Sequence, residues 1–160
     1  MSRIATGVAD TVLDELFASL RPARTTLRLE VPGMNFPCIA EVVAEGQRAM
    51  TEDNSIDQRA AATATWVMEQ RQVLVQADVS FGPPPPPALV EAYGVRAQML
   101  APVVANDRAV GWLSVHSDHV RAWTPEEVAS ITLAAELLGA HHDRICDEPG
   151  YRRWIGEGQQ

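Results

Sequence analysis

The fold is decided by residues 96–142, which read RAQMLAPVVANDRAVGWLSVHSDHVRAWTPEEVASITLAAELLGAHH. Two mainly apolar runs flank an Asn-Asp pair at 106–107, which tolerates the positive φ of a tight turn, so this part predicts a β-hairpin. A helix should follow, because the Thr124 hydroxyl can accept from the Glu127 amide while the Glu127 side chain reaches back. Pro125 then occupies the first helical position, where its missing N–H is no loss.

Periodicity predicts the remaining elements. Apolar residues recur at helical spacing near the N-terminus, and residues 25–31 alternate between apolar and polar, as in a half-buried strand. Ser55 and Gln58 have the spacing of a second capping box. The predicted elements are a helix over 3–20, strands over 25–31 and 38–44, a helix from about 55 to 71, a strand over 73–77, a short helix over 88–93, two strands between 95 and 116, and a final helix over 125–145.

Proline and glycine mark the connections between these elements. Pro32-Gly33 has the chemistry of a type II turn, and Pro83 to Pro87 predict an extended polyproline II loop. Gly94 is expected to end the short helix in the left-handed conformation. Residues 146–160 show no periodicity, and Pro149-Gly150 marks a turn there. We expect the tail to pack down through Tyr151, Trp154 and Ile155.

The order of predicted elements indicates an α+β fold with a mainly antiparallel sheet between layers of helices. The closing half of the chain resembles that of a GAF domain, through Ala101-Pro102-Val103, Val110-Gly111-Trp112-Leu113-Ser114 and Thr124 to Glu127. The resemblance extends more weakly over about Arg24 to Ala140. It implies a GAF-like sheet of five to six strands, with the terminal helices on one face and a small-molecule pocket on the other.

The predicted organisation is a single domain with two terminal segments. Residues 1–22 should form an N-terminal amphipathic helix, 23–145 the GAF domain with its C-terminal helix, and 146–160 a C-terminal tail.

Composition excludes several classes of function. The net charge is −8 and no run holds more than two adjacent basic residues, so we expect no nucleic-acid groove. All 13 basic residues are Arg, and the absence of Lys excludes a Schiff-base lysine and a Walker-type phosphate loop. No apolar run reaches membrane-spanning length, and acidic residues interrupt any signal-like core. We therefore expect a soluble, cytoplasmic protein without membrane contact.

Ten residues are candidates for lining the pocket that the resemblance implies. The aromatic candidates are Phe36, Trp66, Phe81, Tyr93 and Trp112, each of which simple core packing would also explain. The polar candidates interrupt otherwise apolar strands and are Arg96, Gln98, Ser114 and His116. A buried polar group needs a partner that a ligand could supply, although the sheet margin would expose these groups to solvent instead. Cys38 is the last candidate, either as a redox thiol or as a small buried residue.

The catalytic patterns of GAF-like proteins are missing from the chain. Free methionine-(R)-sulfoxide reductases carry motif cysteines in two stretches that here read 58–66 and 82–88, and neither holds a cysteine. Bilin attachment needs a pocket Cys that is commonly followed by His, and neither Cys38-Ile39 nor Cys146-Asp147 matches that pair. The residue set of cyclic-nucleotide-binding members includes a Lys, which this chain lacks. We therefore expect no catalytic residue, no metal and no cofactor. A haem or metal sensor through His116 and His119 lacks an evident third ligand.

The function that we expect is a non-catalytic sensor of an unidentified small organic ligand, signalling through a partner protein. The last helix has a second apolar seam, so a homodimer through Ile4–Leu20 and Val128–Ile145 is expected. Three alternatives stay open. One is a thiol-dependent enzyme that uses Cys38, alone or with His116. Another is a ligand-free interaction module that uses the Pro83–Pro87 loop or the Tyr151–Ile155 tail. The third and least favoured is a haem or metal sensor through His116.

Overall fold

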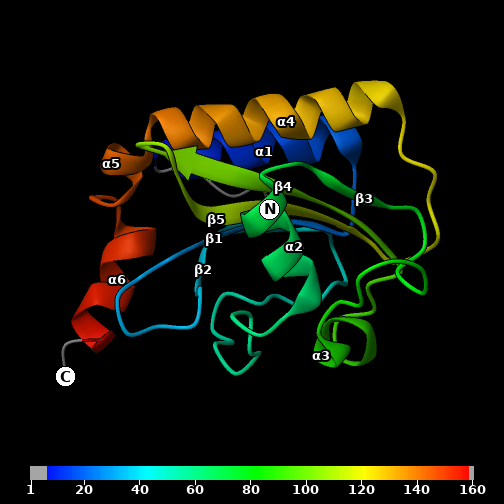
Figure 1. Cartoon of the computed structure of the whole chain (residues 1–160), viewed down its shortest axis with the longest axis horizontal. Helices are drawn as coiled ribbons and strands as arrows, with labels where there is room; N and C mark the ends of the chain where they lie inside the picture. The colour runs from blue at the N-terminus through cyan, green and yellow to red at the C-terminus, as the bar shows by residue number, and fades with distance from the viewer. Residues whose placement is uncertain (1–6, 159–160) are drawn as a thin grey trace.

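An antiparallel sheet forms the centre of the molecule. The computed structural model describes residues 7–158. Its elements are α1 (Val8–Leu20), β1 (Arg24–Leu29), β2 (Cys38–Val43), α2 (Ala62–Gln70), β3 (Leu74–Gln76), α3 (Pro87–Glu91), β4 (Ala97–Ala105), β5 (Arg108–Ser117), α4 (Pro125–Ala140), α5 (His142–Ile145) and α6 (Pro149–Gly158). The five strands have the order β2-β1-β5-β4-β3 and every neighbouring pair is antiparallel (Figure 1). The predicted α+β class is confirmed.

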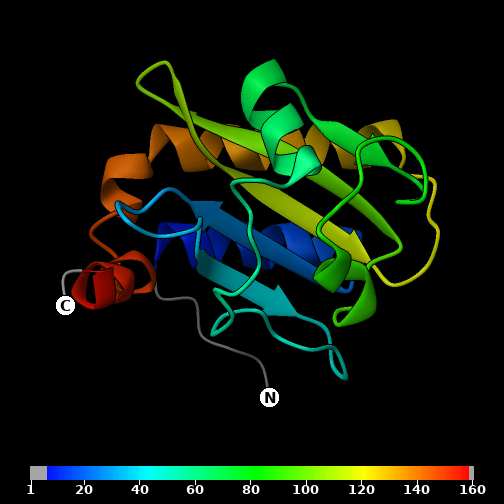
Figure 2. The same cartoon turned by 60° about the horizontal axis from the view of Figure 1, so that its bottom comes forward.

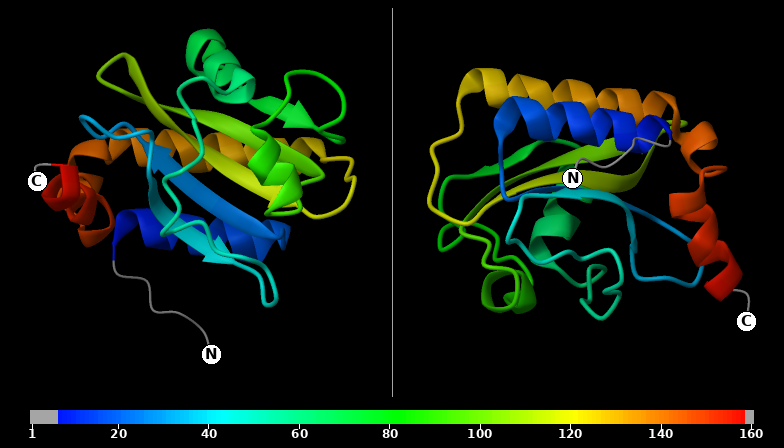
Figure 3. Two further views of the ribbon diagram at one scale, coloured as in Figure 1. Left: turned by 90° about the horizontal axis from the view of Figure 1, so that it is seen from below. Right: turned by 180° about the vertical axis from the view of Figure 1, so that it is seen from behind.

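Helices α1 and α4 lie side by side on one face of the sheet (Figure 3). The predicted capping box begins α4, because the Glu127 amide donates to Thr124 Oγ1 over 3.1 Å and the Thr124 amide donates to the Glu127 carboxylate over 2.9 Å. Between the helices and the sheet lies the larger apolar core, which includes Leu13, Leu16, Leu27, Met99, Leu113, Ile131 and Leu138. The predicted start of the first helix, including Ile4, lies outside the described residues. No helix within residues 7–158 is both long and apolar enough to cross a membrane.

Strands β4 and β5 form the predicted hairpin. Asn106 and Asp107 have φ of 52° and 61°, the left-handed conformation that a two-residue type I′ turn requires at both positions. The turn pairs Ala105 with Arg108, and a β-bulge between Val103 and Val104 then shifts the register by one residue, which places Gln98 opposite His116 and Leu100 opposite Ser114. Opposite residues of an antiparallel pair point to the same face, so the hairpin separates one set of side chains under the helices from another set on the far side.

Two glycines let helices lie close against the sheet. A Cβ atom at Gly139, near the end of α4, would lie 2.2 Å from the carbonyl oxygen of Val104 on β4. One at Gly150 in α6 would lie 2.3 Å from the carbonyl oxygen of Ile39 on β2. Both distances are far inside van der Waals contact, so the position of each helix depends on the absence of a side chain.

Helices α2 and α3 and the segments that join them cover the other face of the sheet (Figure 2). The predicted capping box of Ser55 and Gln58 is wrong, because α2 begins only at Ala62 and has no side-chain cap. The Asn35 side chain competes for this segment, since its carbonyl oxygen accepts from the amides of Gln58 and Arg59. The turn residue Gly94 adopts the predicted left-handed conformation, with φ of 68°.

Strand β1 is buried on both faces, so the prediction of a half-buried strand is wrong. Its apolar residues face α1 and α4, as expected, and Leu27 lies in the core. The alternate residues Arg24, Thr26 and Arg28 are only 0%, 1% and 3% exposed, because the loop-rich layer covers them. That layer includes Phe36, Arg48 and Tyr93, whose backbone carbonyls accept hydrogen bonds from the two arginines.

The C-terminal part of the chain differs from the prediction in two ways. Helix α4 ends at Ala140 rather than near Ile145, and the tail that was expected to lack regular structure contains α6. The predicted packing of the tail is confirmed for Trp154, whose indole N–H donates to the Cys38 carbonyl over 3.1 Å. Glu148, just before α6, accepts from the Val8 amide over 2.8 Å and so caps the N-terminus of α1.

Candidate functional site

The loop-covered face of the sheet carries rows of polar side chains that the strand registers align. Gln76 on β3 lies opposite Gln98 on β4, Gln98 lies opposite His116 on β5, and His116 lies opposite Arg24 on β1. Each of these four residues is at most 4% exposed. A second row contains Leu100, Ser114, Thr26 and Glu41, and a third contains Trp112, Arg28 and Cys38. This face is therefore a buried polar surface, unlike the apolar face under α1 and α4.

Arg24 is fully buried at one end of the first row. Its Nη2 donates to the carbonyl of Arg48 over 3.0 Å and to the carbonyl of Tyr93 over 3.4 Å. The guanidinium also lies 5.5 Å from the centre of the Tyr93 ring. Its Nε has no hydrogen-bond partner. Burial lowers the pKa of Arg24, opposed by the negative charge of Glu41, so the protein holds this cation at an energetic cost.

Arg28 is the second buried cation on this face. Its Nη1 donates to the Phe36 carbonyl over 2.9 Å, and its Nη2 lies 3.8 Å from the sulfur of Met50, a weak acceptor. The Phe36 ring in turn packs on Trp112, with 4.9 Å between ring centres. A guanidinium has five N–H donors, so one strong acceptor leaves most of its hydrogen-bonding capacity unused.

The two guanidinium groups on this face have no carboxylate in direct contact, although the negative charge of Glu41 acts on Arg24 from a distance. Among the side chains that the structure describes, no carboxylate forms an ion pair within 4.0 Å of either group, whereas ion pairs do form elsewhere. The half-buried Glu41 is engaged with a loop instead, because its carboxylate accepts from the Met50 amide over 2.8 Å and from the Thr51 hydroxyl over 2.9 Å. Burying a charge without direct pairing costs free energy, and an anion placed beside these groups would lower that cost.

Two further polar groups beside the arginines lack partners. The Nδ1 atom of His116 is buried and has no hydrogen-bond partner. Burial, together with the positive charges of Arg24 and Arg28, holds the pKa of His116 well below 6.5, so its ring is neutral at neutral pH. The Oε1 atom of Gln98 is also unpartnered, although its Nε2 donates to Gln76 over 2.7 Å.

A small enclosed cavity lies between this face and the loops. Its lining residues are Arg28, Gln98, Leu100, Trp112, Ser114 and His116 from the sheet, and Met50, Gln58, Thr63 and Leu89 from the covering layer. The space open to the centre of a water molecule is about 10 Å³, which is room for roughly one water. A wider hollow of about 290 Å³ shares Gln58 and Trp112 with the cavity and continues along Phe36, Ala64 and Met68.

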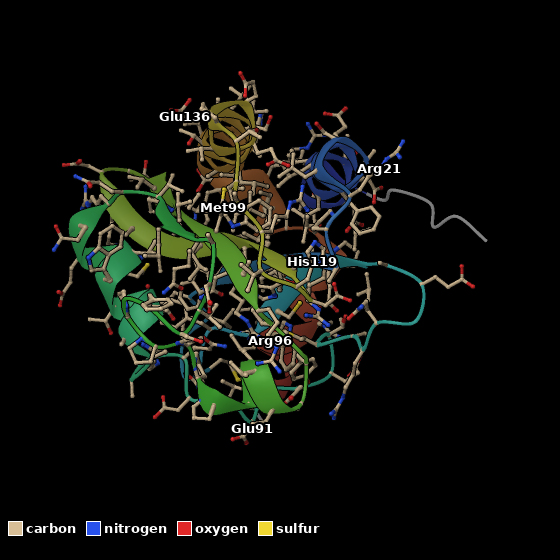
Figure 4. All side chains as sticks on the ribbon, turned by 90° about the vertical axis from the view of Figure 1, so that its right-hand side faces the viewer. Arg21, Glu91, Arg96, Met99, His119 and Glu136 are labelled. Atoms are coloured by element: carbon tan, nitrogen blue, oxygen red, sulfur yellow. The ribbon has the colours of Figure 1, made fainter. Side chains whose placement is uncertain are left out.

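The structure brings together only some of the residues that the sequence predicted for the pocket. Gln98, Trp112, Ser114 and His116 line the cavity. Phe36 lines the adjoining hollow, Cys38 lies opposite Arg28, and Tyr93 contacts Arg24. Trp66 packs at the partly exposed side of α2. Phe81 is 74% exposed in the loop before the proline run, and Arg96 is exposed just before β4 begins. Figure 4 shows Arg96 beside α3, on the other side of the sheet from Met99.

The sequence reasoning missed Arg24 and Arg28, which are the main charges of the site. They are four residues apart on a strand, so they point to the same face. The alternation in sequence is typical of a strand with one face in solvent, so it predicts that these side chains are exposed. The missing information is the second covering layer, in which the segments around Phe36, Arg48 and Tyr93 lie over this face of β1.

Cys38, the candidate for redox chemistry, and His116 and His119, the candidates for metal binding, lie in surroundings that do not suit those roles. Cys38 is completely buried, and burial raises the pKa of its thiol to about 12, so it keeps its proton at neutral pH. His119 is well exposed and contacts Asp118 over 3.0 Å, whereas His116 is buried. Among the described residues, no three His, Cys, Asp or Glu side chains come close enough to hold a metal ion.

Comparison with known proteins identifies the family. A family model described as the GAF domain matches residues 6–141. The chain belongs to the GAF domain family. A search of curated protein sequences finds no significant match.

Solved structures with the same fold include other GAF-domain proteins. The cyanobacteriochrome receptor PixJ superposes with a TM-score of 0.70 at 20% identity, over 86% of this chain and 94% of that one. A far-red absorbing protein with bound biliverdin IXa gives 0.68 at 18%, over 89% and 92%. The chromophore-binding domain of an unusual bacteriophytochrome from R. palustris gives 0.72 at 16%, over 89% of this chain and 58% of that one. At these identities the similarity establishes a shared GAF fold.

Proposed function

We propose that this GAF domain is a non-catalytic sensor that binds a small organic molecule on the loop-covered face of its sheet. The observation that carries the proposal is the pair of buried guanidinium groups without a carboxylate partner, next to unpartnered atoms of His116 and Gln98. Burying a charged group without a partner costs free energy of folding unless another group, such as a ligand, compensates its charge. The biliverdin bound by one structural neighbour supports the view that this fold accommodates small molecules.

The segment that covers the site offers a route for the signal. Glu41 on β2 holds the amide of Met50, a residue that lines the cavity, and Tyr93 beside Arg24 donates to Asp53 over 2.5 Å. Further along, Arg153 on α6 donates to the carbonyl of Thr51 and pairs with Glu52 over 2.9 Å. A ligand that moves residues 50–53 therefore changes the contacts of α6. We propose that a partner protein reads this change.

The dimer that we propose uses the outer surface of α1 and α4. Leu133 and Leu137 of α4 are 58% and 42% exposed, beside a shallow groove of about 160 Å³ that Val12 and Leu16 of α1 also line. These leucines form the second apolar seam of α4, which the single domain does not need for its own core. A second copy of the chain is the proposed occupant. Leu133→Glu should then shift the protein to monomer in analytical ultracentrifugation, while the exposed Glu136→Gln should not.

Native mass spectrometry and a thermal-shift screen test the sensor function. A ligand at 100 times its Kd stabilises the folded state by about 2.7 kcal/mol, which corresponds to a rise in Tm of roughly 5–10 °C for a chain of this size. We expect such a rise with at least one class of small molecule, or a co-purified mass that disappears on denaturation. A protein that is apo and shows no shift across a broad library would refute the proposal.

A ligand-free interaction module is the second candidate. It is favoured by the enclosed cavity of only about 10 Å³ and by a surface hollow of about 400 Å³ between residues 56–62 and the proline run. In this case a protein partner, rather than a small molecule, would occupy the surface near Pro84 to Pro87. Arg28→Gln would then leave the binding of that partner unchanged.

A further inference from the structure

The shape of the site and the identity of its charges indicate which class of molecule it binds. The inference rests on the sensor function proposed above and concerns the same face of the sheet. Three properties narrow the class: the sign of the charge, the size of the space around it, and the character of the adjoining hollow.

The charge of the site selects an anion. Arg28 lines the cavity with one strong hydrogen bond, to the Phe36 carbonyl, and Arg24 lies two rows further along the same strand face, with Thr26 between them. Guanidinium groups bind carboxylates through paired N–H donors, and such charge-assisted bonds are about twice as strong as neutral ones. The unpartnered Nδ1 of His116 is a further polar atom that a ligand can engage, since the His116 side chain also lines the cavity.

The size of the cavity limits the anion to a small one. The space of about 10 Å³ holds roughly one water molecule. A carboxylate group is of similar size, whereas the tetrahedral phosphate group is larger and carries more charge. A single guanidinium in direct contact also matches the single charge of a carboxylate better than the charge of a phosphate.

The lining of the adjoining hollow indicates the chemical character of the rest of the ligand. It measures about 290 Å³ and is reached past Gln58 and Trp112, which line both spaces. Phe36, Ala64 and Met68 line its far side, and its one cation and one anion, Arg59 and Glu69, are exposed. Gln58 stands between the two spaces, and its backbone is held by Asn35 over 3.0 Å. A ligand that spans the two spaces requires the Gln58 side chain to move aside, while its backbone stays held by Asn35.

We propose that the site binds a small monocarboxylic acid, with the carboxylate on Arg28 and an aliphatic or aromatic body in the hollow between Phe36, Met68 and Trp112. The hollow is near the lower end of the volumes that drug-sized ligands occupy, roughly 300–1,000 Å³. A tetrapyrrole is too large for it unless the covering segments move apart.

Isothermal titration calorimetry of the full chain tests this assignment. The probes are acetate, hexanoate, benzoate and phenylacetate, with phenylacetamide as the neutral counterpart of the last. Inorganic phosphate and biliverdin represent the competing classes. We expect at least one of the larger acids to bind, acetate to bind more weakly, and phenylacetamide to bind on the order of tenfold or more weakly than phenylacetate, because it lacks the charge.

Three variants locate the binding. Arg28→Gln should weaken acid binding on the order of tenfold to a hundredfold, while Arg96→Gln makes the same change of charge at an exposed position and should leave it unchanged. If Arg28→Gln does not fold, Met68→Gln gives an independent test in the hollow. It should weaken the larger acids several-fold and leave acetate unaffected.

The outcomes separate this inference from the proposed function. Equal binding of phenylacetamide and phenylacetate overturns the carboxylate class and leaves the sensor standing. Binding of phosphate or biliverdin, without detectable binding of any of the four acids, has the same consequence. If none of the seven probes binds and a broad screen is also negative, the sensor function fails together with the inference.

Discussion

Gly139→Ala is the substitution for which two physical effects predict opposite results. Alanine is the better helix former, so in an exposed helix this change would stabilise the protein by about 1 kcal/mol. In this fold the added Cβ would lie 2.2 Å from the carbonyl oxygen of Val104, against 3.4 Å or more for an ordinary contact. The end of α4 must therefore retreat from β4 by about 1.2 Å.

The steric effect should outweigh the helix propensity. Overpacking of this kind typically costs about 1–3 kcal/mol. Because the clash is with a backbone atom, which cannot rotate away, we expect a cost at the upper end of that range, about 2–3 kcal/mol. The retreat also loosens Leu138, which is fully buried beside it. We expect a net loss of about 1–2 kcal/mol, which is a fall in Tm of roughly 2–8 °C for this chain length.

Gly156→Ala is the matched control, because Gly156 is also helical and a Cβ atom there meets nothing within 4 Å. It should leave Tm unchanged or raise it slightly. Calorimetric and urea-induced unfolding of both variants beside the parent protein measure the difference. A Gly139→Ala protein as stable as the parent, or more stable, would refute the close packing of α4 on β4.

Three further predictions follow from buried groups and caps. In the folded protein His116 stays neutral, whereas in the unfolded chain it takes up a proton near pH 6.5. The free energy of unfolding should therefore be highest above that pH, and about 1.4 kcal/mol lower at pH 5.5 than at pH 7.5. Urea unfolding at both pH values should show that His116→Gln loses most of this difference and that His119→Gln keeps it. Iodoacetamide on the native protein should leave Cys38 unmodified and label the partly exposed Cys146 first, and mass spectrometry showing native labelling of Cys38 would contradict its burial. Glu148→Ala removes the cap of α1 and should lower stability by about 1 kcal/mol in thermal unfolding, and an unchanged Tm would mean that the cap contributes nothing.

The parts of the fold that could be predicted are those whose signals are local. The Asn106-Asp107 turn and the Thr124 cap each satisfy their own backbone within a few residues, so their sequences are sufficient. Ser55 and Gln58 look like the same kind of signal, yet Asn35, some 20 residues earlier in the chain, takes the amide that the capping box would have used. A distant competitor of this kind leaves no trace in the local pattern.

Helix α6 and the polar site failed for a related reason. The tail has no clear periodicity, and α6 is held in place by the contact of Trp154 with Cys38 on β2 and by the close approach at Gly150. Arg24 and Arg28 look like solvent-facing residues in the sequence, because the alternation of β1 does not show that the segments around Phe36, Arg48 and Tyr93 cover its second face. By contrast, three of the four predicted residues that line the cavity, Gln98, Ser114 and His116, are visible in the sequence as polar interruptions of apolar strands, and the fourth, Trp112, as an aromatic residue.

The two faces of the sheet divide the molecule into parts that can change independently. Residues that pack under α1 and α4 keep the domain folded, whereas the alternate residues of the same strands, such as Arg28, Ser114 and His116, line the cavity of the proposed site. Consecutive residues along a strand therefore have different roles, one in stability and the next in the proposed binding. Such a sheet can acquire a new ligand through substitutions at every second position without touching the residues that hold it together. Libraries that vary only those positions, and the loops above them, should retain folded protein while they alter specificity.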